Sequence, residues 1–285
     1  MHVRINAGFH TSIAGGLHRS VDRIVELGCS AMQIFARNPR SWRFTPVGKE
    51  EVALFRSKRE ESGINPVAVH TTYLINLSSP DDDIFEKSLG LFKSELALAE
   101  ALGADYLVTH LGSSRGAGGE FALRRVKYAM TEVKKEGLAK ATTILAENSA
   151  GSGESFGSDL SDIGAVLDHA DSIGLKNGLC FDTCHGFAAG YPMRTEAEVK
   201  ALAPRIEREA GLGRLKLLHL NDSNGGFNSR VDRHEDIGKG RIGPAGLEAV
   251  LKDPVFSRLP IIMETPRKDK SDDLRNLKAL IRFLK

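Results

Sequence analysis

The sequence predicts an α/β protein in which eight parallel strands, each followed by a helix, close into a barrel. Strand-like and helix-like segments alternate along the whole chain. Its 285 residues suit one barrel of this kind, the TIM barrel, which typically takes about 250 residues. Histidine or carboxylate residues follow most of the strand-like runs, at the place where such a barrel forms its functional rim.

The eight strands are predicted from short apolar runs rich in Val, Ile, Leu and Ala. Runs of this kind are typical of parallel strands that are covered on both faces. They span residues 5–10, 31–36, 66–70, 105–110, 142–147, 177–183, 214–220 and 260–265.

A helix is predicted after each strand. Gly28, Gly103 and Gly211 stand where a left-handed C-terminal cap would end a helix, and Ser158 stands where an N-cap would begin the fifth one. Crossovers between parallel strands are right-handed, and eight of them close a barrel. No linker rich in Pro, Gly or Ser divides the chain, so we expect a single domain over residues 1–285. The helices span about 16–27, 50–62, 84–102, 120–137, 158–170, 195–211, 244–252 and 270–284.

Two connections are longer than an ordinary loop. They span residues 37–48 and 221–243 and are rich in Arg and Gly. Long loops in a compact domain are usually functional. Because both follow strands, we expect them on the same rim of the barrel.

The composition indicates an ordinary globular protein. It is 41% hydrophobic and 27% charged, and its formal charge of +2 neither requires nor excludes a nucleic acid partner. The three cysteines argue against a disulfide framework and fit a reducing compartment. The amino terminus has no apolar leader, and no run reaches the roughly 18 apolar residues of a membrane span. We therefore expect a cytoplasmic monomer without membrane contacts.

Side chains that bind metals follow six consecutive predicted strands. They are separated by 40, 37, 35, 37 and 45 residues, each close to one strand–helix unit, and three more follow in adjoining loops. Imidazole and carboxylate together favour zinc and similar divalent cations. The strand-end residues are His70, His110, Glu147, Asp182, His219 and Glu264, and the loop residues are His185, Asp232 and His234.

Each of these residues alone has an ordinary structural explanation. A single histidine at a strand end is more often a hydrogen-bonded structural residue, and a single Glu could cap a neighbouring helix. The joint pattern reverses this balance, because four converging carboxylates without cations would repel one another. The pattern therefore predicts a hydrolytic site with several metals.

Other candidates carry less weight. His10 ends the first strand and is expected to neighbour the site, whereas His2, His18 and His169 are expected on the surface. Cys180 alternates with Phe181 within a strand and belongs to the core. Cys184 lies between Asp182 and His185 and could be a further ligand. The glycine runs at 116–119 and 151–153 fit no nucleotide-binding motif.

These residues carry a resemblance to the endonuclease IV family of apurinic/apyrimidinic endonucleases. The similarity runs nearly end to end, and DTCH and SRVDRH at this separation are its most specific parts. One departure is Asn228, where the family favours Gly, and this concerns the loop and not a ligand. The matching segments are VAVHTTYLINL (67–77), LVTHLGS (107–113), AENSAGSG (146–153), CFDTCHGFAAGY (180–191), HLNDS (219–223), FNSRVDRH (227–234), GKGRIG (238–243) and METP (263–266).

The resemblance implies a site with three metal ions, normally zinc, with manganese possible at one position. His70, His110 and Glu147 would hold the first ion. Glu147 would bridge to the second, which Asp182, His219 and Glu264 complete. His185, Asp232 and His234 would hold the third. Glu147 and Glu264 are the carboxylates tied most directly to catalysis.

The resemblance also implies a substrate and products. The enzyme would hydrolyse the phosphodiester 5′ to an abasic site in damaged duplex DNA, leaving a 3′-hydroxyl and a 5′-deoxyribose phosphate, and would remove blocking groups from 3′ ends. Chemistry next to a missing base requires the nucleotide to leave the stack. Arg40, Tyr73 and Leu74 would insert into the duplex, and Arg230 and Arg233 would contact phosphates, as could Lys239 and Arg241.

Two other functions remain open from the residues. Metal-dependent sugar isomerases and epimerases also place His, Asp and Glu at barrel strand ends, but one or two metals would leave His185, Asp232 and His234 without a joint task. A non-catalytic module that binds DNA lesions would not need a complete ligand set.

Overall fold

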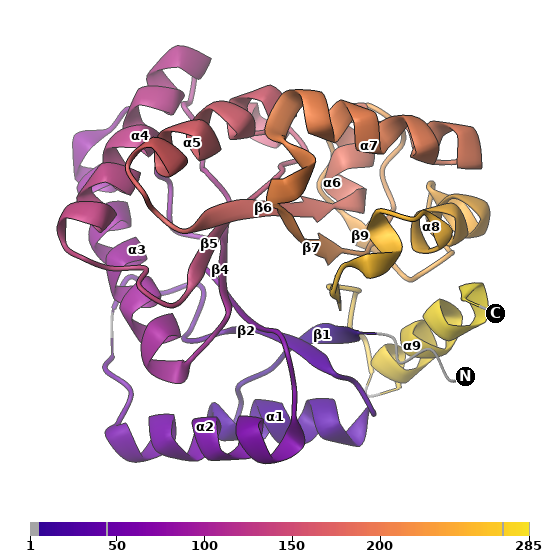
Figure 1. The fold of residues 1–285 in the computed structure, drawn as a ribbon, viewed down its shortest axis with the longest axis horizontal. Coiled ribbons are helices and arrows are strands. Elements are labelled where there is room, and N and C mark those ends of the chain that lie inside the picture. Colours follow the sequence, from indigo (N-terminus) through magenta and orange to yellow (C-terminus); the bar gives the residue numbers. More distant parts are fainter. Residues whose placement is uncertain (1–5, 44, 270, 285) are drawn as a thin grey trace.

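The computed structural model describes residues 6–43, 45–269 and 271–284, and it confirms the closed barrel (Figure 1). In the described chain, eight parallel strands neighbour one another in the order β1, β10, β7, β6, β5, β4, β3 and β2, and β2 pairs with β1 to close the sheet. The strands are β1 (Ala7–Thr11), β2 (Ala31–Phe35), β3 (Val67–His70), β4 (Tyr106–Thr109), β5 (Thr143–Glu147), β6 (Asn177–Asp182), β7 (Leu215–His219) and β10 (Ile261–Met263).

The helices surround the barrel on its outside, as Figure 1 shows. Every predicted helix is present within a few residues of its expected bounds. Short 3₁₀ turns lie at Ser152–Glu154, Leu212–Arg214 and Phe256–Arg258. The α-helices are α1 (His18–Glu26), α2 (Lys49–Ser62), α3 (Asp82–Leu102), α4 (Gly119–Lys135), α5 (Leu160–Ser172), α6 (Thr183–Ala189), α7 (Glu196–Ala210), α8 (Gly243–Lys252) and α9 (Asp272–Phe283).

Three local predictions were wrong. Thr183 does not extend β6 but begins α6, a short helix that the sequence pattern did not predict. Asp159, not Ser158, caps α5, because its carboxylate accepts a hydrogen bond from the backbone N–H of Ser161. Gly211 has φ 82° and ψ 111°, outside the left-handed helical region, whereas Gly103 has the predicted left-handed conformation at the end of α3.

Some predictions fall outside the described residues. They concern His2, the start of the first strand at residue 5 and the start of the last helix at residue 270. Among the residues that the structure does describe, no helix is long and apolar enough to cross a membrane.

The long connection after β7 contains a small antiparallel ladder of β8 (Asp222–Ser223) and β9 (His234–Glu235). The buried carboxylate of Asp222 anchors the far end of this connection, since it accepts hydrogen bonds from the backbone N–H groups of Gly240, Ile242 and Gly243. A Cβ at Gly240 would lie 2.5 Å from an oxygen of Asp222, so glycine is required for this close approach. These contacts hold the connection against the rim of the barrel, and they therefore place His234 there.

The apolar interior has two parts. The larger cluster fills the space between the strands and the surrounding helices. The smaller cluster takes one residue from each of seven strands and fills the inside of the barrel. Its members are Ala31, Ala68, Val108, Leu145, Cys180, Leu217 and Ile262. Cys180 is thus a core residue, as predicted.

The close approach of α5 and α7 depends on Gly164. A Cβ at this position would lie 2.0 Å from the backbone carbonyl oxygen of Glu209, and backbone cannot move aside cheaply. We expect Gly164→Ala to destabilise the protein by about 1–3 kcal/mol, the usual cost of overpacking. Gly90, exposed within α3, has open space around its Cα, so Gly90→Ala should stabilise by about 0.5–1 kcal/mol.

Urea unfolding of the two variants and the wild type checks this pair. Equal destabilisation by both substitutions would contradict the packing argument.

Candidate metal centre

The nine residues singled out from the sequence meet at the carboxyl ends of the strands. Five of them end a strand or directly follow one on β3, β4, β5, β7 and β10. Asp182 ends β6 and caps α6, because its Oδ1 accepts a hydrogen bond of 2.7 Å from the backbone N–H of His185. This cap turns the chain sharply and places His185 next to the strand-end residues.

Glu147 lies at the centre of the cluster and is fully buried. One carboxylate oxygen, Oε2, lies 2.9 Å from Nε2 of His70 and 3.5 Å from Nε2 of His110. The other, Oε1, lies 3.0 Å from Nδ1 of His219 and 3.3 Å from Nδ1 of His185. Burial alone would raise the pKa of Glu147, but the positive charge available on His110 and His219 holds it well below its ordinary value.

A second group surrounds His219. Its Nδ1 lies 3.3 Å from Oε2 of Glu264 and 4.0 Å from Oδ2 of Asp182, in addition to its contact with Glu147. Asn221 links Asp182 to the backbone of Glu264: its amide N–H donates to the carboxylate of Asp182, and its carbonyl oxygen accepts from the backbone N–H of Glu264. The carboxylates are thus held in fixed positions.

A third group stands closer to solvent. Nε2 of His185 lies 3.1 Å from Oδ1 of Asp232 and 3.2 Å from Nε2 of His234. Nδ1 of His234 lies 2.9 Å from the backbone carbonyl oxygen of Glu264, which orients its ring. Desolvation opposes ionisation of Asp232, but the hydrogen bond from His185 and its charge lower the pKa of Asp232 to about 2.

The nine side chains form three sets, and in each set the potential ligand atoms lie within 4.8 Å of one another. Two of the sets share Glu147, and each of the other eight residues belongs to one of the three sets. Cys184 forms a further set with Asp182 and His234, but burial raises the pKa of its thiol to about 12, which disfavours the thiolate that binds metals. The three sets are His70, His110 and Glu147; Glu147, Asp182, His219 and Glu264; and His185, Asp232 and His234.

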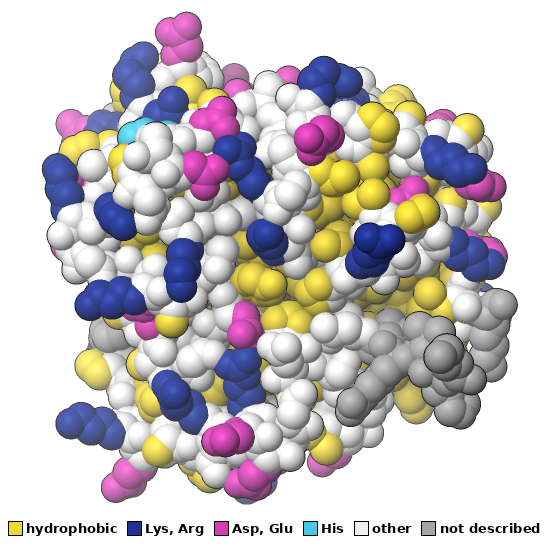
Figure 2. Space-filling model, in the orientation of Figure 1, with side chains coloured by type: hydrophobic (Ala, Val, Ile, Leu, Met, Phe, Trp, Pro, Cys, Tyr) yellow, Lys and Arg dark blue, Asp and Glu magenta, His cyan; other side chains and the backbone are white. Residues whose placement is uncertain are grey.

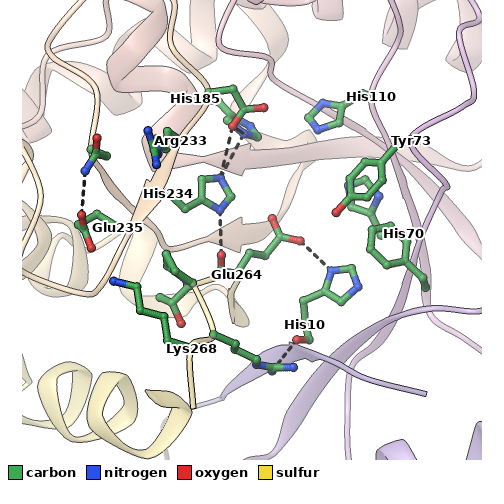
Figure 3. A pocket seen from close by; sticks show the side chains of 16 residues that line it. His10, His70, Tyr73, His110, His185, Arg233, His234, Glu235, Glu264 and Lys268 are labelled. Atoms are coloured by element: carbon green, nitrogen blue, oxygen red, sulfur yellow. Dashed lines mark hydrogen bonds and ion pairs between the residues drawn. The ribbon is translucent and has the colours of Figure 1, made fainter. Parts of the chain in front are cut away.

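A pocket of about 730 Å³ is lined by six of the nine side chains, namely His70, His110, His185, Asp232, His234 and Glu264. Figure 3 shows His70 and Tyr73 on one side of it and Arg233 and Lys268 on the other. Arg267 also lines the pocket, and its guanidinium donates a hydrogen bond of 2.6 Å to the carbonyl oxygen of His10. Arg267 and Lys268 were not predicted from the sequence, because they follow METP without a charge pattern of their own.

Of the five residues expected to contact DNA, two line the pocket and three do not. Tyr73 and Arg233 line the pocket, whereas Arg40, Leu74 and Arg230 lie on the rim outside it. Tyr73 is 66% exposed, and its ring stands edge-on to Phe35 at 5.0 Å between centroids. Arg230 is exposed, and its Nη1 donates a hydrogen bond of 3.2 Å to Oγ of Ser158.

The rim loop after β8 has an unusual backbone. Asn228 and Arg230 have φ of 56° and 58°, in the left-handed region that favours glycine. Asparagine tolerates this region better than most residues. The departure from Gly at position 228 therefore keeps the loop conformation.

The histidines other than the nine candidate ligands differ in their distance from the site. Nδ1 of His10 lies 2.9 Å from Oε1 of Glu264, so it neighbours the site as predicted. His18 and His169 are half-buried and not simply exposed: His18 contacts Glu51, and His169 contacts the hydroxyl of Thr131. Neither contributes to the pocket.

Figure 2 shows the face of the molecule seen in Figure 1. Basic and acidic side chains are interspersed on it, with hydrophobic side chains gathered towards the centre. Histidine is seen near α4 and α5 on this face and not at its centre.

The comparison with known proteins identifies the family. The sequence profile described as "Xylose isomerase-like TIM barrel" matches residues 21–285. A protein of Chloroflexus aggregans named "Probable endonuclease 4" is 43% identical over 281 residues, which cover 97% of this chain and 96% of that protein. The chain belongs to the endonuclease IV family.

Other members of the family agree. The "Probable endonuclease 4" of Methanoculleus marisnigri is 42% identical over 270 residues, 95% of each chain. The crystal structure of endonuclease IV from Thermus thermophilus superimposes with a TM-score of 0.87 at 36% identity and covers 98% of each chain. The resemblance inferred from the motifs is therefore confirmed, and the chain is an enzyme of the nuclease class.

Glu95 and Arg37 form a buried ion pair beneath two loops of the rim. Glu95 on α3 is 1% exposed, accepts a hydrogen bond of 3.0 Å from the backbone N–H of Thr72, and lies 3.9 Å from Nε of Arg37. The Arg37 guanidinium in turn donates to the carbonyl oxygens of Ser41 and Arg43. This pair joins the two loops that carry Arg40 and Tyr73.

We expect Glu95→Gln to flatten the pH dependence of stability. Burial raises the pKa of Glu95 from 4.5 to about 7, so the unfolded chain releases this proton at lower pH than the folded protein. The stabilisation from the bound proton is fully present below pH 4.5 and is lost as the pH rises to about 7, a change of up to about 3 kcal/mol. The measurement is urea unfolding between pH 4.5 and 8.

The readout is the difference between wild type and Glu95→Gln, since the other carboxylates titrate in both proteins. Glu86→Gln, an exposed change on the same helix, should follow the wild type. Parallel curves for Glu95→Gln and wild type would contradict the argument.

Proposed function

We propose that this enzyme is an apurinic/apyrimidinic endonuclease of DNA repair. It hydrolyses the phosphodiester 5′ to an abasic site in duplex DNA, leaves a 3′-hydroxyl and a 5′-deoxyribose phosphate, and removes blocking groups from 3′ ends. The observation that carries the proposal is the convergence of three potential ligand sets, each with at least one residue that lines the same pocket, and the presence of basic residues in the wall of that pocket. The family membership of the chain supports it.

The residues present fit divalent cations. Nδ1 of His219 lies close to oxygen atoms of Glu147, Glu264 and Asp182 at 3.0, 3.3 and 4.0 Å. One imidazole N–H can donate to only one of these carboxylates, and two of the three are fully buried. A cation among them would interact with all three oxygens and with a neutral imidazole nitrogen.

We assign one ion to each set. His70, His110 and Glu147 would hold the first, Glu147 with Asp182, His219 and Glu264 the second, and His185, Asp232 and His234 the third. Nitrogen and oxygen ligands favour zinc, with manganese possible at one position. When bound, such ions lower the pKa of water and neutralise charge on a phosphoryl group.

The remaining residues of the pocket are suited to binding and orienting the DNA. Arg233, Arg267 and Lys268 can donate hydrogen bonds to phosphate oxygens at one wall of the pocket, and Arg230 can do so on the rim. At the opposite wall, Tyr73 exposes most of its side chain next to Leu74. We assign Tyr73, Leu74 and Arg40 to the gap that opens in the duplex when the abasic nucleotide leaves the stack.

A duplex that carries one synthetic abasic residue tests this proposal. We expect a single incision immediately 5′ to that residue, and we expect it to disappear after prolonged chelation and return with zinc. Metal analysis should give about three ions per chain, whereas one or two ions and activity on a sugar would favour the isomerase alternative. Incision that survives complete metal removal would refute the metal-dependent mechanism.

Glu147→Gln extends this experiment. Because Glu147 belongs to two ligand sets, its loss should abolish incision and reduce the metal content together. Glu86→Gln is the matched control and should behave as wild type. Binding of the abasic duplex without any cleavage by the wild type would favour the lesion-binding module.

Arg233→Ala tests the phosphate contacts. Removing one side chain that binds a phosphate should reduce the slope of log affinity against log salt concentration by about one unit. Arg208 is exposed in the last turn of α7, at the opposite end of the barrel from the pocket, so Arg208→Ala should leave the slope unchanged. Titration of the abasic duplex at several salt concentrations gives both slopes, and equal slopes for Arg233→Ala and wild type would remove Arg233 from the interface.

A further inference from the structure

We propose that Gln33 is a positioning residue that selects which nitrogen of His219 faces the metal cluster and that fixes the carboxylate of Glu264. This inference rests on the metal-dependent function proposed above. Gln33 lies in β2 and is fully buried. Its side chain is hydrogen-bonded to two of the nine candidate ligands, and the motifs singled out in the sequence do not include it.

The amide of Gln33 makes three short contacts. Its Oε1 lies 2.9 Å from Nε2 of His219. Its Nε2 lies 2.7 Å from Oε1 of Glu264 and 3.0 Å from Nδ1 of His10. One side chain therefore touches two candidate ligands from different strands, β7 and the end of β10.

The chemistry of the donors and acceptors fixes the direction of these bonds. An ionised carboxylate only accepts hydrogen bonds, so the NH₂ group of Gln33 must face Glu264. The carbonyl oxygen of Gln33 then faces His219 and can only accept. Nε2 of His219 must therefore carry a proton, and in the neutral ring the lone pair is on Nδ1.

This lone pair faces the cluster. Nδ1 of His219 is the atom that lies beside Glu147, Glu264 and Asp182. Of the two oxygens of Glu264, Oε1 is taken by Gln33, and Oε2 lies 3.3 Å from Nδ1 of His219. Gln33 thus leaves one atom of each side chain directed at a shared cation.

A purely structural role would not require an amide here. The adjacent layer of side chains inside the barrel, two residues earlier in each strand, is apolar, and a buried amide is costly unless its polar atoms are paired. Both ends of Gln33 are paired with candidate ligands. Groups that orient metal ligands in this way typically change metal affinity by about 10- to 100-fold when they are removed.

The first experiment uses the wild-type enzyme loaded with zinc. Histidine labelled with ¹⁵N reports by two-bond ¹H–¹⁵N correlation which ring nitrogen is protonated, and a His219→Gln variant assigns the signal. We expect His219 to be protonated on Nε2 and not on Nδ1. A zinc-bound Nε2, or a site that takes up no zinc, would overturn the inference, and this measurement does not depend on the folding of a Gln33 variant.

The second experiment compares Gln33→Met with Met32→Leu. Methionine has nearly the volume of glutamine but cannot make the two hydrogen bonds. Met32 is its fully buried neighbour in β2, packed in the outer apolar cluster. Zinc retention is measured by competition with a chromogenic chelator, and kcat and KM are measured on the abasic duplex.

We expect Gln33→Met to retain zinc about 10- to 100-fold less well and to lower kcat with little change in KM, since the DNA-contacting rim is not altered. Met32→Leu should match the wild type. Wild-type zinc retention by Gln33→Met would overturn the inference.

The two proposals can fail separately. If the abasic duplex is not cut but zinc retention falls in Gln33→Met, the proposed function fails and the role of Gln33 stands. If incision occurs and zinc retention is unchanged, the role of Gln33 fails and the proposed function stands.

Discussion

The alternation of side chains along a closed parallel barrel is the constraint on which the site depends. Successive residues of a strand point to opposite sides of the sheet, so a residue two positions after an inward one also points inward. All seven members of the inner apolar cluster are followed, two residues later, by a polar residue of the centre. The pairs are Ala31 and Gln33, Ala68 and His70, Val108 and His110, Leu145 and Glu147, Cys180 and Asp182, Leu217 and His219, and Ile262 and Glu264. The apolar layer thus packs directly beneath the polar layer, on the side of the amino ends of the strands.

Much of the fold and of the centre could be predicted because this rule is local. An apolar run and the polar residue at its end can be recognised in a stretch of five or six residues. His70, Glu147 and Glu264 were predicted in this way. Gln33 was missed because it stands within its run and is an amide, a residue type with no preference for metals. The helix that carries His185 was missed because its cap, Asp182, was interpreted only as a ligand. The pocket wall at Arg267 and Lys268 depends on contacts between distant segments, which no local pattern reveals.

The barrel itself does not decide the chemistry. A D-tagatose 3-epimerase-like protein superimposes on this chain with a TM-score of 0.70 at 16% identity, which shows a common fold and nothing further. What separates such proteins is the set of side chains on the rim. Here the loop between β7 and α8 supplies Asp232 and His234, the two side chains that Nε2 of His185 contacts. The loop therefore distinguishes this centre from one that strand ends alone could build.

The small ladder of β8 and β9 has an evolutionary consequence. The residues of two of the three ligand sets end barrel strands or directly follow them. These two sets are therefore part of the barrel itself. The set of His185, Asp232 and His234 relies on a surface excursion pinned by Asp222. A shortened excursion would delete that set and leave the cylinder intact. The set of potential ligands nearest to solvent can therefore vary without any change in the barrel that carries the other two sets.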